Sequence, residues 1–488
     1  MTAKQTNAED TCLNNQTKPP LEGICDDPEK EGSLSSKEVV SSDLDIGLEA
    51  VEPPGQRSDD DGNTFDGADV DRVASNATTL NFPEGGSEGW LVVFGAFCAM
   101  ISVFGLINSS AVFESYFSTH QLAHHSPSEI GWIFSVYLFI VFFVGIQVGP
   151  IFDHYGGRIL VAAGSLLLCA SLLILSWCET YYQIMLTYSV LGGLGGALLN
   201  PPAYGSIAHF FHERRGLATG IATTSGGVGG IVFPLLLRHL LPTLGFAWSC
   251  RILALILLGL AVPANLLIKT RLPRAPGGMA SVWPDLTIFR DPRYALSSVG
   301  VVFMEWGLFT PTTFIVSYAA AHGTRSATDS YVLLAYLNAA SVVGRVVPGF
   351  LADKFGRFNV IVITISFCAI TVLALWLPAA SSGSMLIAFV VLFGFASGSN
   401  LGLIPVCFGQ LCDSRHYGRY FSTAMMVASF GTLSSVPIAG ALLDIRGEGN
   451  QTGWMSLILF SGISYAIAMV CYAAARVLAV GWRPLVKF

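Results

Sequence analysis

The chain has 488 residues, of which 52% are hydrophobic and 12% are charged, and its formal net charge is −7 at pH 7. A soluble domain carries about twice that share of charged residues. The composition therefore excludes soluble globular, disordered, collagen-like and disulfide-rich proteins and fits a polytopic membrane protein, because twelve spans need about 240 apolar residues.

Residues 1–89 form an acidic tail that differs from the rest of the chain. They hold 20 Asp or Glu and 6 Lys or Arg, whereas residues 90–488 hold 13 and 20. A segment rich in Ser, Asp, Glu and Pro cannot bury enough apolar surface to offset its ordering entropy. We expect a disordered cytoplasmic tail without a cleaved leader, so that insertion relies on the first internal span.

Twelve apolar runs of about 20 residues follow the tail, separated by polar, Gly or Pro breaks. The first six cover 90–113, 130–150, 158–177, 183–206, 216–237 and 248–268. The second six cover 296–318, 331–351, 359–378, 385–408, 421–443 and 453–478. They predict an all-α membrane protein with an N-terminal six-helix bundle at 90–268, a cytoplasmic central loop at 269–295 and a C-terminal bundle at 296–488.

The distribution of Lys and Arg between the loops predicts the orientation. With both termini in the cytosol, the inner loops and the C-terminal end hold fifteen of these residues, and the outer loops hold Arg238, Arg325 and Arg446. Positive loops stay on the cytoplasmic side. We therefore predict a multi-pass protein with both termini cytoplasmic, in the cell membrane rather than the vacuolar membrane.

A loop motif occurs twice. GPIFDHYGGR follows the second run, GFLADKFGR follows the eighth, and their Asp residues are 200 positions apart, which indicates two duplicated six-span halves. In each copy Gly allows close helix approach, Asp lies near a helix end and Arg offers paired donors. We predict a conformational latch formed by Gly149, Asp153, Gly156, Arg158, Gly349, Asp353, Gly356 and Arg357.

The duplicated loop resembles the hallmark of the major facilitator superfamily. EGGSEGW before the first run, HFFHERRGLATGIATTSGGVGGIVFP across the fourth and fifth, and YLNAASVVGRVVPGFLADKFGRFNV through the eighth resemble the fungal branch of its monocarboxylate-porter family. The resemblance covers residue 84 to about residue 480. It implies two six-helix pseudo-repeat bundles, the major facilitator fold, that rock around a substrate site at the membrane midplane.

Ionisable side chains inside a span are costly unless they face a cavity or a partner, so they are functional candidates. The resemblance assigns Arg345 to the anionic part of the substrate, and snorkelling to the surface is the alternative. Glu305 is the only carboxylate deep in a span and is the candidate proton carrier; a protonated structural Glu is the alternative. Animal members carry a Lys where Asn108 stands and an Asp where Ser341 stands, so their mechanism does not simply transfer.

Amide side chains within the spans complete the predicted site. Interhelical hydrogen bonding would explain any one of them, and a polar central cavity would explain the set. The predicted substrate-binding residues are Arg345, Glu305, Asn108, Asn338 and Asn400, with proton coupling through Glu305.

Signals for catalysis or for a bound metal are missing from the sequence. The ten cysteines stand singly, with no CxxC pair and no Cys/His cluster at metal spacing. His209 and His212 form no ligand set and are expected to be solvated. No nucleophile/base pair and no Gly-x-x-x-x-Gly-Lys-Ser/Thr string occurs. We predict no catalytic residue, no metal and no cofactor, and hence not an enzyme.

The leading hypothesis is a secondary active transporter that moves a small organic acid or related metabolite by alternating access. Its partners would be a small anionic substrate, protons and membrane lipid, with no nucleic acid. Efflux of a fungal secondary metabolite is an alternative, since Asn108 in place of a cation permits larger, less charged ligands. A non-transporting nutrient sensor is another, although such sensors usually have a long cytoplasmic domain.

Overall fold

The structure is a computed structural model that describes residues 82–272, 283–322, 327–379, 382–444 and 451–482. Most of the predicted acidic tail at 1–89 lies outside the described residues, as does part of the predicted central loop at 269–295. The limits of those two segments therefore stay predictions. The described residues all belong to one unit of the chain.

The helices form two halves. The first half contains α2 (Gly86–Asn108), α3 (Ser110–Thr119), α4 (Pro127–Phe143), α5 (Gly145–Tyr155), α6 (Arg158–Leu175), α7 (Tyr181–Ile184), the π-helical turn Met185–Gly192, α8 (Gly193–Phe210) and α9 (Arg215–Leu267). The second half contains α10 (Pro292–Ala321), α11 (Ala327–Phe355), α12 (Arg357–Thr371), the π-helical turn Val372–Trp376, α13 (Gly383–Phe408), α14 (Tyr417–Asp444) and α15 (Gln451–Val480). Short 3-10 turns at Leu286–Arg290 and Ser414–His416 precede α10 and α14.

Helix α9 contains two membrane spans. Eleven helical segments among the described residues are long and apolar enough to cross a membrane, and α9 is one of them. Its 53 residues would extend for about 80 Å, whereas the hydrocarbon core is about 30 Å thick. The backbone leaves helical geometry at Gly245, where φ is +76°, a value that favours glycine. The predicted runs 216–237 and 248–268 are the two arms of α9, and the predicted fold of twelve membrane helices is confirmed.

Two equivalent glycines separate consecutive helices in the two halves. Gly156 ends α5 with a φ of +87°, and Gly356 ends α11 with a φ of +95°. Residues with a Cβ rarely adopt this conformation, so each loop motif needs its glycine to reverse the chain. The next helix begins almost at once, at Arg158 in the first half and at Arg357 in the second.

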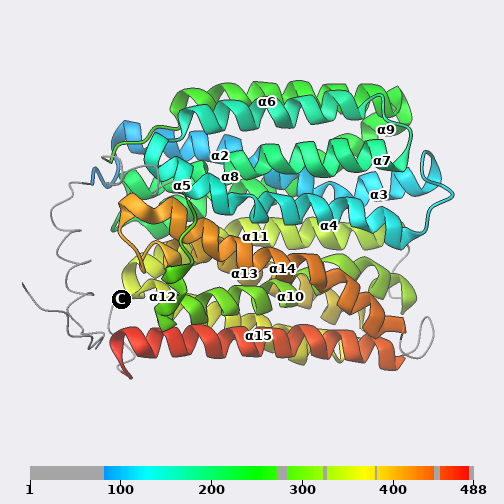
Figure 1. Ribbon diagram of the computed structural model, residues 1–488. Coiled ribbons are helices and arrows are strands. Elements are labelled where there is room, and N and C mark those ends of the chain that lie inside the picture. Colours follow the sequence, from blue (N-terminus) through cyan, green and yellow to red (C-terminus); the bar gives the residue numbers. More distant parts are fainter. Residues whose placement is uncertain (1–81, 273–282, 323–326, 380–381, 445–450, 483–488) are drawn as a thin grey trace, which may run out of the picture. The chain divides into compact units, whose positions relative to one another are not determined.

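The helices lie side by side along one direction, with α5 toward the left and α3 toward the right of Figure 1. Their outer faces are apolar. On α6, Ile159, Leu166 and Leu173 are all exposed and follow one another at intervals of two helical turns. An exposed apolar stripe of this kind on a membrane helix faces lipid. We call the end of the molecule at which α5 and α11 finish the Asp end, because Asp153 and Asp353 lie there.

Candidate functional site

Asp153 lies in the last turn of α5, in the first half, and is buried. Its carboxylate accepts hydrogen bonds from the backbone N–H groups of Gly418 and Arg419, both at 2.8 Å. These amides belong to the first turn of α14, where a helix has N–H groups without intrahelical partners and a positive dipole end. Asp153 therefore caps a helix of the second half.

Asp353 makes the reciprocal contact. It lies near the end of α11, in the second half, and its carboxylate accepts hydrogen bonds from the N–H groups of Gly216 and Leu217, both at 2.8 Å. These amides belong to the first turn of α9, in the first half. The duplicated aspartates thus join the two halves twice, each by capping a helix of the other half.

Glycines at the same crossings let the backbones touch. A Cβ on Gly149 would meet the carbonyl group of Gly418, and a Cβ on Gly349 would lie 2.5 Å from the carbonyl oxygen of Gly216. Distances this short are incompatible with a side chain at either position. The glycines of the repeated motif are therefore required for the halves to close at the Asp end.

The arginines of the two motif copies lie differently. Arg357 is buried, and its guanidinium donates to the carbonyl oxygen of His212 in the first half and to the side chain of Gln410. Arg158 is exposed, so its predicted latch role is not supported by its position. The first copy has one extra residue, Gly157, between the Asp and the Arg, which turns the arginine by about 100° around α6.

Arg215 is a further residue that joins the two halves, and the sequence interpretation missed it. It is buried, and its guanidinium crosses to the second half, where it donates to the carbonyl oxygen of Gly409 at 2.8 Å and to Oγ of Ser414 at 2.7 Å. Sequence reasoning counted it as an ordinary cytoplasmic charge. Gly216, which follows it, corresponds to Gly418 at the other capped helix, but Tyr417 precedes Gly418, so the repeat gave no signal for this arginine.

His209 corrects a further expectation. The sequence predicted that it would be solvated near a span end, but it is 5% exposed and its ring lies 5.5 Å from that of Phe152. The contact between the two halves covers this end of α8. His209 is buried because the two halves meet at the Asp end. Its position near the end of a predicted span could not show this.

A cavity of about 470 Å³ lies between the halves, further from the Asp end. Residues from four helices of each half line it, and most of them are apolar or aromatic. The lining residues are Phe104, Phe142, Asn200, Tyr204, Thr223, Glu305, Arg345, Leu401, Ile404, Pro405, Phe421 and Met425. Such a cavity suits a ligand with an apolar body and a few polar groups.

Arg345 faces this cavity and does not snorkel to the surface. It is 8% exposed, and its guanidinium donates from Nη1 to the backbone carbonyl of Thr223 and lies against Gly226 of α9. Its buried Nε has no hydrogen-bond partner among the described residues. Tyr204 lies close enough to interact with it electrostatically. One nitrogen of the guanidinium is thus anchored by the backbone of the first half, and the buried Nε is left without a partner.

Glu305 lines the same cavity from α10 and is 4% exposed. No ion pair joins Glu305 to Arg345 in the described structure, so the two predicted site residues share the cavity without neutralising each other. Asn200 also lines the cavity, and its buried Oδ1 has no partner among the described residues. A buried polar atom without a partner is costly, and a ligand donor would satisfy it.

The other predicted amides lie in three different places. Asn108 donates to the carbonyl oxygens of Phe104 at 2.8 Å and of Gly226 at 3.2 Å, next to the cavity wall. Asn338 donates across the halves to the carbonyl oxygen of Gly230 at 3.4 Å. Neither Asn108 nor Asn338 is among the cavity-lining residues. Asn400 corrects a prediction: it is 2% exposed and bonds within the second half.

Asn400 accepts from Oγ1 of Thr364 at 2.7 Å and donates to Sγ of Cys368 at 3.4 Å, both on α12. It is not among the cavity-lining residues. Both the oxygen and the nitrogen of its amide are thus bonded inside the second half. This is the interhelical hydrogen bonding that was the alternative to a role in the cavity. We therefore exclude Asn400 from the proposed site.

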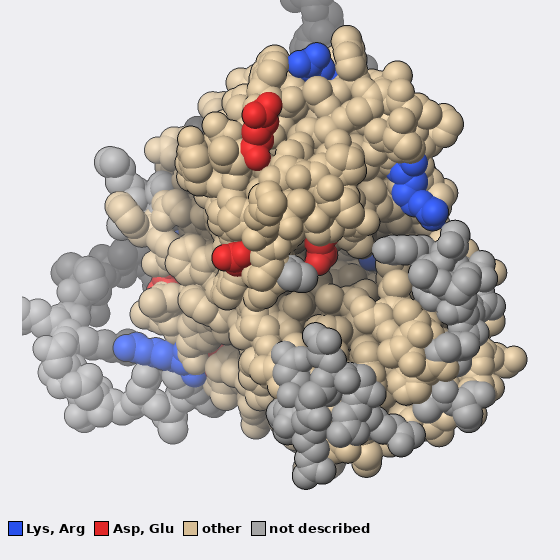
Figure 2. Space-filling view, turned by 90° about the vertical axis from the view of Figure 1, so that its right-hand side faces the viewer, with Lys and Arg blue, Asp and Glu red and all other residues tan. Residues whose placement is uncertain are grey.

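Figure 2 shows the end of the molecule opposite to the Asp end. Its described surface is mostly uncharged, with a hollow near the middle of the face. Asn108, at the end of α2, is exposed. The bonds that join the halves through Asp153, Asp353, Arg215 and Arg357 all lie at the opposite end, the Asp end.

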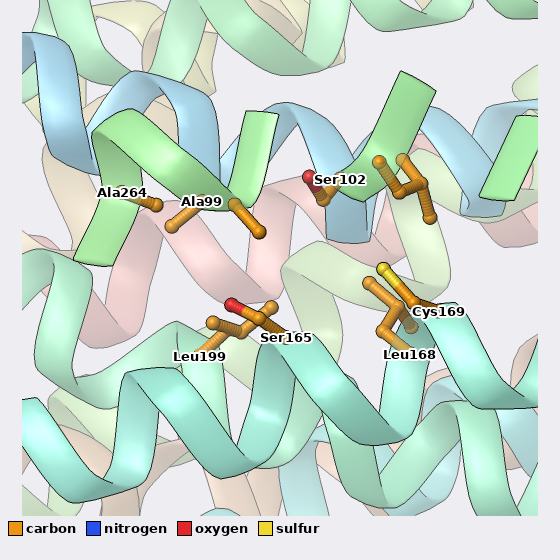
Figure 3. A pocket seen from close by; sticks show the side chains of 9 residues that line it. Ala99, Ser102, Ser165, Leu168, Cys169, Leu199 and Ala264 are labelled. Atoms are coloured by element: carbon orange, nitrogen blue, oxygen red, sulfur yellow. The ribbon is translucent and has the colours of Figure 1, made fainter. Parts of the chain in front are cut away.

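A smaller cavity of about 200 Å³ lies inside the first half, among α2, α6, α8 and α9. Figure 3 shows Ser102, Ser165 and Cys169 around it together with small apolar side chains. Ser102 donates to the carbonyl oxygen of Cys98 at 3.0 Å, and Ser165 accepts from Nδ2 of Asn265 at 3.1 Å. With no charged lining residue and with its hydroxyl groups engaged, this space is a packing gap.

The duplicated aspartates should control the rate of the conformational cycle more than ligand affinity, because they lie at the Asp end and not in the cavity. We expect Asp153→Asn or Asp353→Asn to slow turnover, while ligand affinity stays within about tenfold, or about 1.4 kcal/mol. An amide keeps one acceptor but loses the charge that strengthens two bonds to a helix N-terminus.

Turnover and equilibrium binding of purified variants would test this. Asp285→Asn is the matched control, because Asp285 accepts a hydrogen bond from the N–H of Thr287 at 2.9 Å in its own turn. This bond does not connect the two halves. A large loss of affinity at unchanged turnover would contradict the latch.

Twelve membrane helices in two halves, joined at one end by duplicated motifs around an interior cavity, define a transporter fold. The chain belongs to the Major Facilitator Superfamily: residues 92–412 and 295–484 match that family. It is therefore a multi-pass membrane protein of a class that binds and transports small molecules.

Characterised relatives are similar over most of their length. The chain is 34% identical over 473 residues to the riboflavin transporter MCH5 of Saccharomyces cerevisiae, covering 92% of this chain and 89% of that protein. It is 34% identical over 397 residues to the aspyridones efflux protein apdF of Emericella nidulans, covering 80% of each chain. Among solved structures, the human organic anion transporter MFSD10 has the same fold, with a TM-score of 0.62 at 12% identity over 79% of this chain and 100% of that chain.

Proposed function

We propose that this protein is an alternating-access carrier for an amphipathic organic acid or a related metabolite, of the monocarboxylate-porter type. The observation that carries the proposal is the cavity between the halves, into which Arg345 brings a buried guanidinium with an unpartnered Nε. A carboxylate or enolate oxygen is the ligand group that a guanidinium binds best.

The aromatic cavity walls favour a substrate larger and less polar than a short monocarboxylate. Phe104, Phe142, Tyr204 and Phe421 supply most of the ring surface. Aromatic side chains bury large apolar area and stack on flat ligands. By the resemblance, Asn108 beside the cavity wall stands where animal monocarboxylate carriers have a lysine, so one cation fewer lies near the cavity, which supports transport of larger, less charged acids, including export of a secondary metabolite.

The orientation belongs to the same proposal. With the Asp end in the cytosol, as the Lys and Arg loop counts predict, both termini are cytoplasmic and the protein is at the cell membrane. The contacts of Asp153, Asp353, Arg215 and Arg357 then close the cytoplasmic side. The structure would correspond to an outward-facing state.

Riboflavin is a second candidate substrate, and one observation favours it. The match to the yeast riboflavin transporter covers 92% of this chain, which is a larger share than residues 90–488 make up. The similarity therefore extends into the acidic tail. The flat ring system of riboflavin also suits an aromatic cavity.

Counterflow in liposomes would test these substrates. Purified protein would be loaded with unlabelled pyruvate, naphthoate or riboflavin, and entry of the same labelled compound measured. We expect counterflow of naphthoate and none of pyruvate; counterflow of riboflavin alone would favour the second candidate.

A bulky side chain in the cavity should abolish whichever flux is found. Leu401→Trp fills the cavity, and Leu166→Trp on the exposed face of α6 is the matched control. Absence of counterflow for all three compounds, or equal flux in Leu401→Trp, would contradict the proposed site.

A further inference from the structure

The segment Phe82–Gly85, just before α2, is bound to the loop between α8 and α9. The carboxylate of Glu84 accepts hydrogen bonds from three successive backbone N–H groups: His212 at 2.7 Å, Glu213 at 2.8 Å and Arg214 at 3.0 Å. The N–H of Glu84 donates to the carbonyl oxygen of Phe210 at 3.2 Å. We call Phe82–Gly85 the pre-helix segment.

Ring contacts strengthen this attachment. The ring of Phe82 stacks on that of His212 with centroids 5.2 Å apart, and the ring of Trp90, in the first turns of α2, lies 5.3 Å from that of Phe211. Polar and aromatic contacts therefore hold the same loop.

The backbone of the pre-helix segment is arranged to place this carboxylate. Glu84 has a φ of +50°, and it is the one residue other than glycine with a positive φ in the described part of the chain. Gly85 and Gly86 follow with φ values of +144° and +76°. A non-glycine residue in this region costs free energy and persists where surrounding contacts compensate. Three bonds to one charged group are such contacts.

The loop held by Glu84 is also the one that the second half binds in order to close the Asp end. Arg357 donates to the carbonyl oxygen of His212, and Asp353 accepts from Gly216 and Leu217 at the start of α9. Glu84 thus fixes the position of the carbonyl group and of the helix start that Arg357 and Asp353 must meet.

Charge balance at this place also favours closure. Glu84 interacts electrostatically with the buried guanidinium groups of Arg215 and Arg357, and unfavourably with the carboxylate of Asp353. Burial, helped by the two guanidinium groups, lowers the pKa of His212 to about 4, so that residue is neutral near pH 7. Two carboxylates then balance two buried cations, and removal of Glu84 would leave one cation in excess.

The second half has no counterpart of this attachment in the described structure. The equivalent loop before α14 is capped from within, since the side chain of Asp413 accepts from the N–H of Arg415 at 3.0 Å. Among the described residues, the loop before α9 is the one that is held by the pre-helix segment.

We propose that Glu84 is a positioning residue that sets the balance between the closed and open states of the Asp end. The proposal rests on alternating access. Because Glu84 and its loop both belong to the first half, its effect on closure is exerted through Arg357 and Asp353 of the second half.

Distances between spin labels at the Asp end would test the proposal without any substrate. Tyr155→Cys and Phe355→Cys place labels at the exposed ends of α5 and α11. Cys12→Ser and Cys25→Ser remove the tail thiols, and the eight described cysteines are buried. We expect Glu84→Gln to lower the ratio of the short-distance to the long-distance population by about tenfold.

Two controls make the result specific. Glu88→Gln removes a nearby carboxylate whose ion pair with Lys269, at 3.4 Å, is exposed and lies within the first half, so it should leave the ratio unchanged. Asp353→Asn removes a contact between the halves and should lower the ratio whether or not Glu84 acts.

An unchanged ratio in Glu84→Gln, beside a lowered ratio in Asp353→Asn, would overturn the role of Glu84 and leave alternating access intact. Unchanged ratios in both variants would overturn alternating access at this end as well. If Glu84→Gln does not give folded protein, Phe82→Ala tests the same attachment, because it removes the stacking on His212 and keeps every polar contact. It should lower the ratio by about threefold, and no change would overturn the proposal.

Discussion

Replacing Arg345 with glutamine is expected to weaken binding of an acidic substrate by about a hundredfold or more, because a charge-assisted bond is lost and the substrate anion is left in a largely apolar cavity. In the structure the guanidinium holds the carbonyl oxygen of Thr223 with one nitrogen and has a free donor at Nε. Glutamine can make the backbone contact but carries no charge.

Arg345→Lys separates the effect of the positive charge from that of the planar shape of the guanidinium. The lysine keeps the positive charge and has no planar fork, so it cannot hold Thr223 and a substrate oxygen in the same arrangement. We expect an intermediate loss of about tenfold. Isothermal titration of the purified variants with the substrate found by counterflow would measure both effects.

Arg251→Gln is the matched control for Arg345. Arg251 also lies in a membrane helix, but its guanidinium stacks on the rings of Trp177 and Trp248 and its Nε donates to Oγ of Ser176 at 3.3 Å. Its loss should leave affinity unchanged. Equal binding by Arg345→Gln and the parent would show that the guanidinium only braces α9.

The fold could be predicted from the sequence because the membrane imposes one solution on each apolar run. A run of about 20 apolar residues must form a helix, since every backbone polar group has to be satisfied within it. Even α9 follows this rule, as its two arms meet at Gly245. The repeat of Asp153 and Asp353 also predicts that both residues lie at one end of the molecule, because each follows an even-numbered span.

The partners of those residues could not be predicted in the same way. Asp153 and Asp353 bind backbone amides, which every residue except proline carries and which leave no trace in the sequence. Whether an arginine reaches the other half depends on its angle around a helix. The first motif copy has one residue more than the second between its Asp and its Arg, and Arg158 is exposed whereas Arg357 is buried.

The residues that line the candidate cavity could also be predicted only in part. Arg345 and Glu305 could be found because ionisable groups are rare in membrane helices. The aromatic lining could not, because Phe104 or Phe421 looks the same in sequence as a lipid-facing phenylalanine. Asn400 failed as a prediction for the opposite reason: an amide inside a span suits a cavity and a neighbouring helix equally well. Glu84 was overlooked because it stands outside the spans.

The structure leaves few candidates for a group that would carry a coupled proton. A carrier driven by a proton gradient needs a group inside the membrane that gains and loses a proton during the cycle. Under the proposed monocarboxylate-porter resemblance, Asn108 and Ser341 stand where the animal carriers have a lysine and an aspartate. Asp153 and Asp353 are occupied by helix capping at the Asp end. Glu305 is a carboxylate that lines the cavity and has no ion pair with Arg345 in the described structure.

Glu305→Gln is therefore expected to abolish accumulation of substrate driven by an imposed pH gradient, while exchange of substrate across the membrane continues. Glutamine keeps the shape of the side chain and cannot ionise, so the loaded carrier still turns over but no longer carries a proton with its substrate. Accumulation in liposomes with an acidic outer medium measures the first process, and counterflow without a gradient measures the second. Glu114→Gln is the matched control, because Glu114 lies in α3 and does not line the cavity. If Glu305→Gln still accumulates substrate, the glutamate is structural and coupling lies elsewhere; if the parent protein ignores the gradient, it is a uniporter.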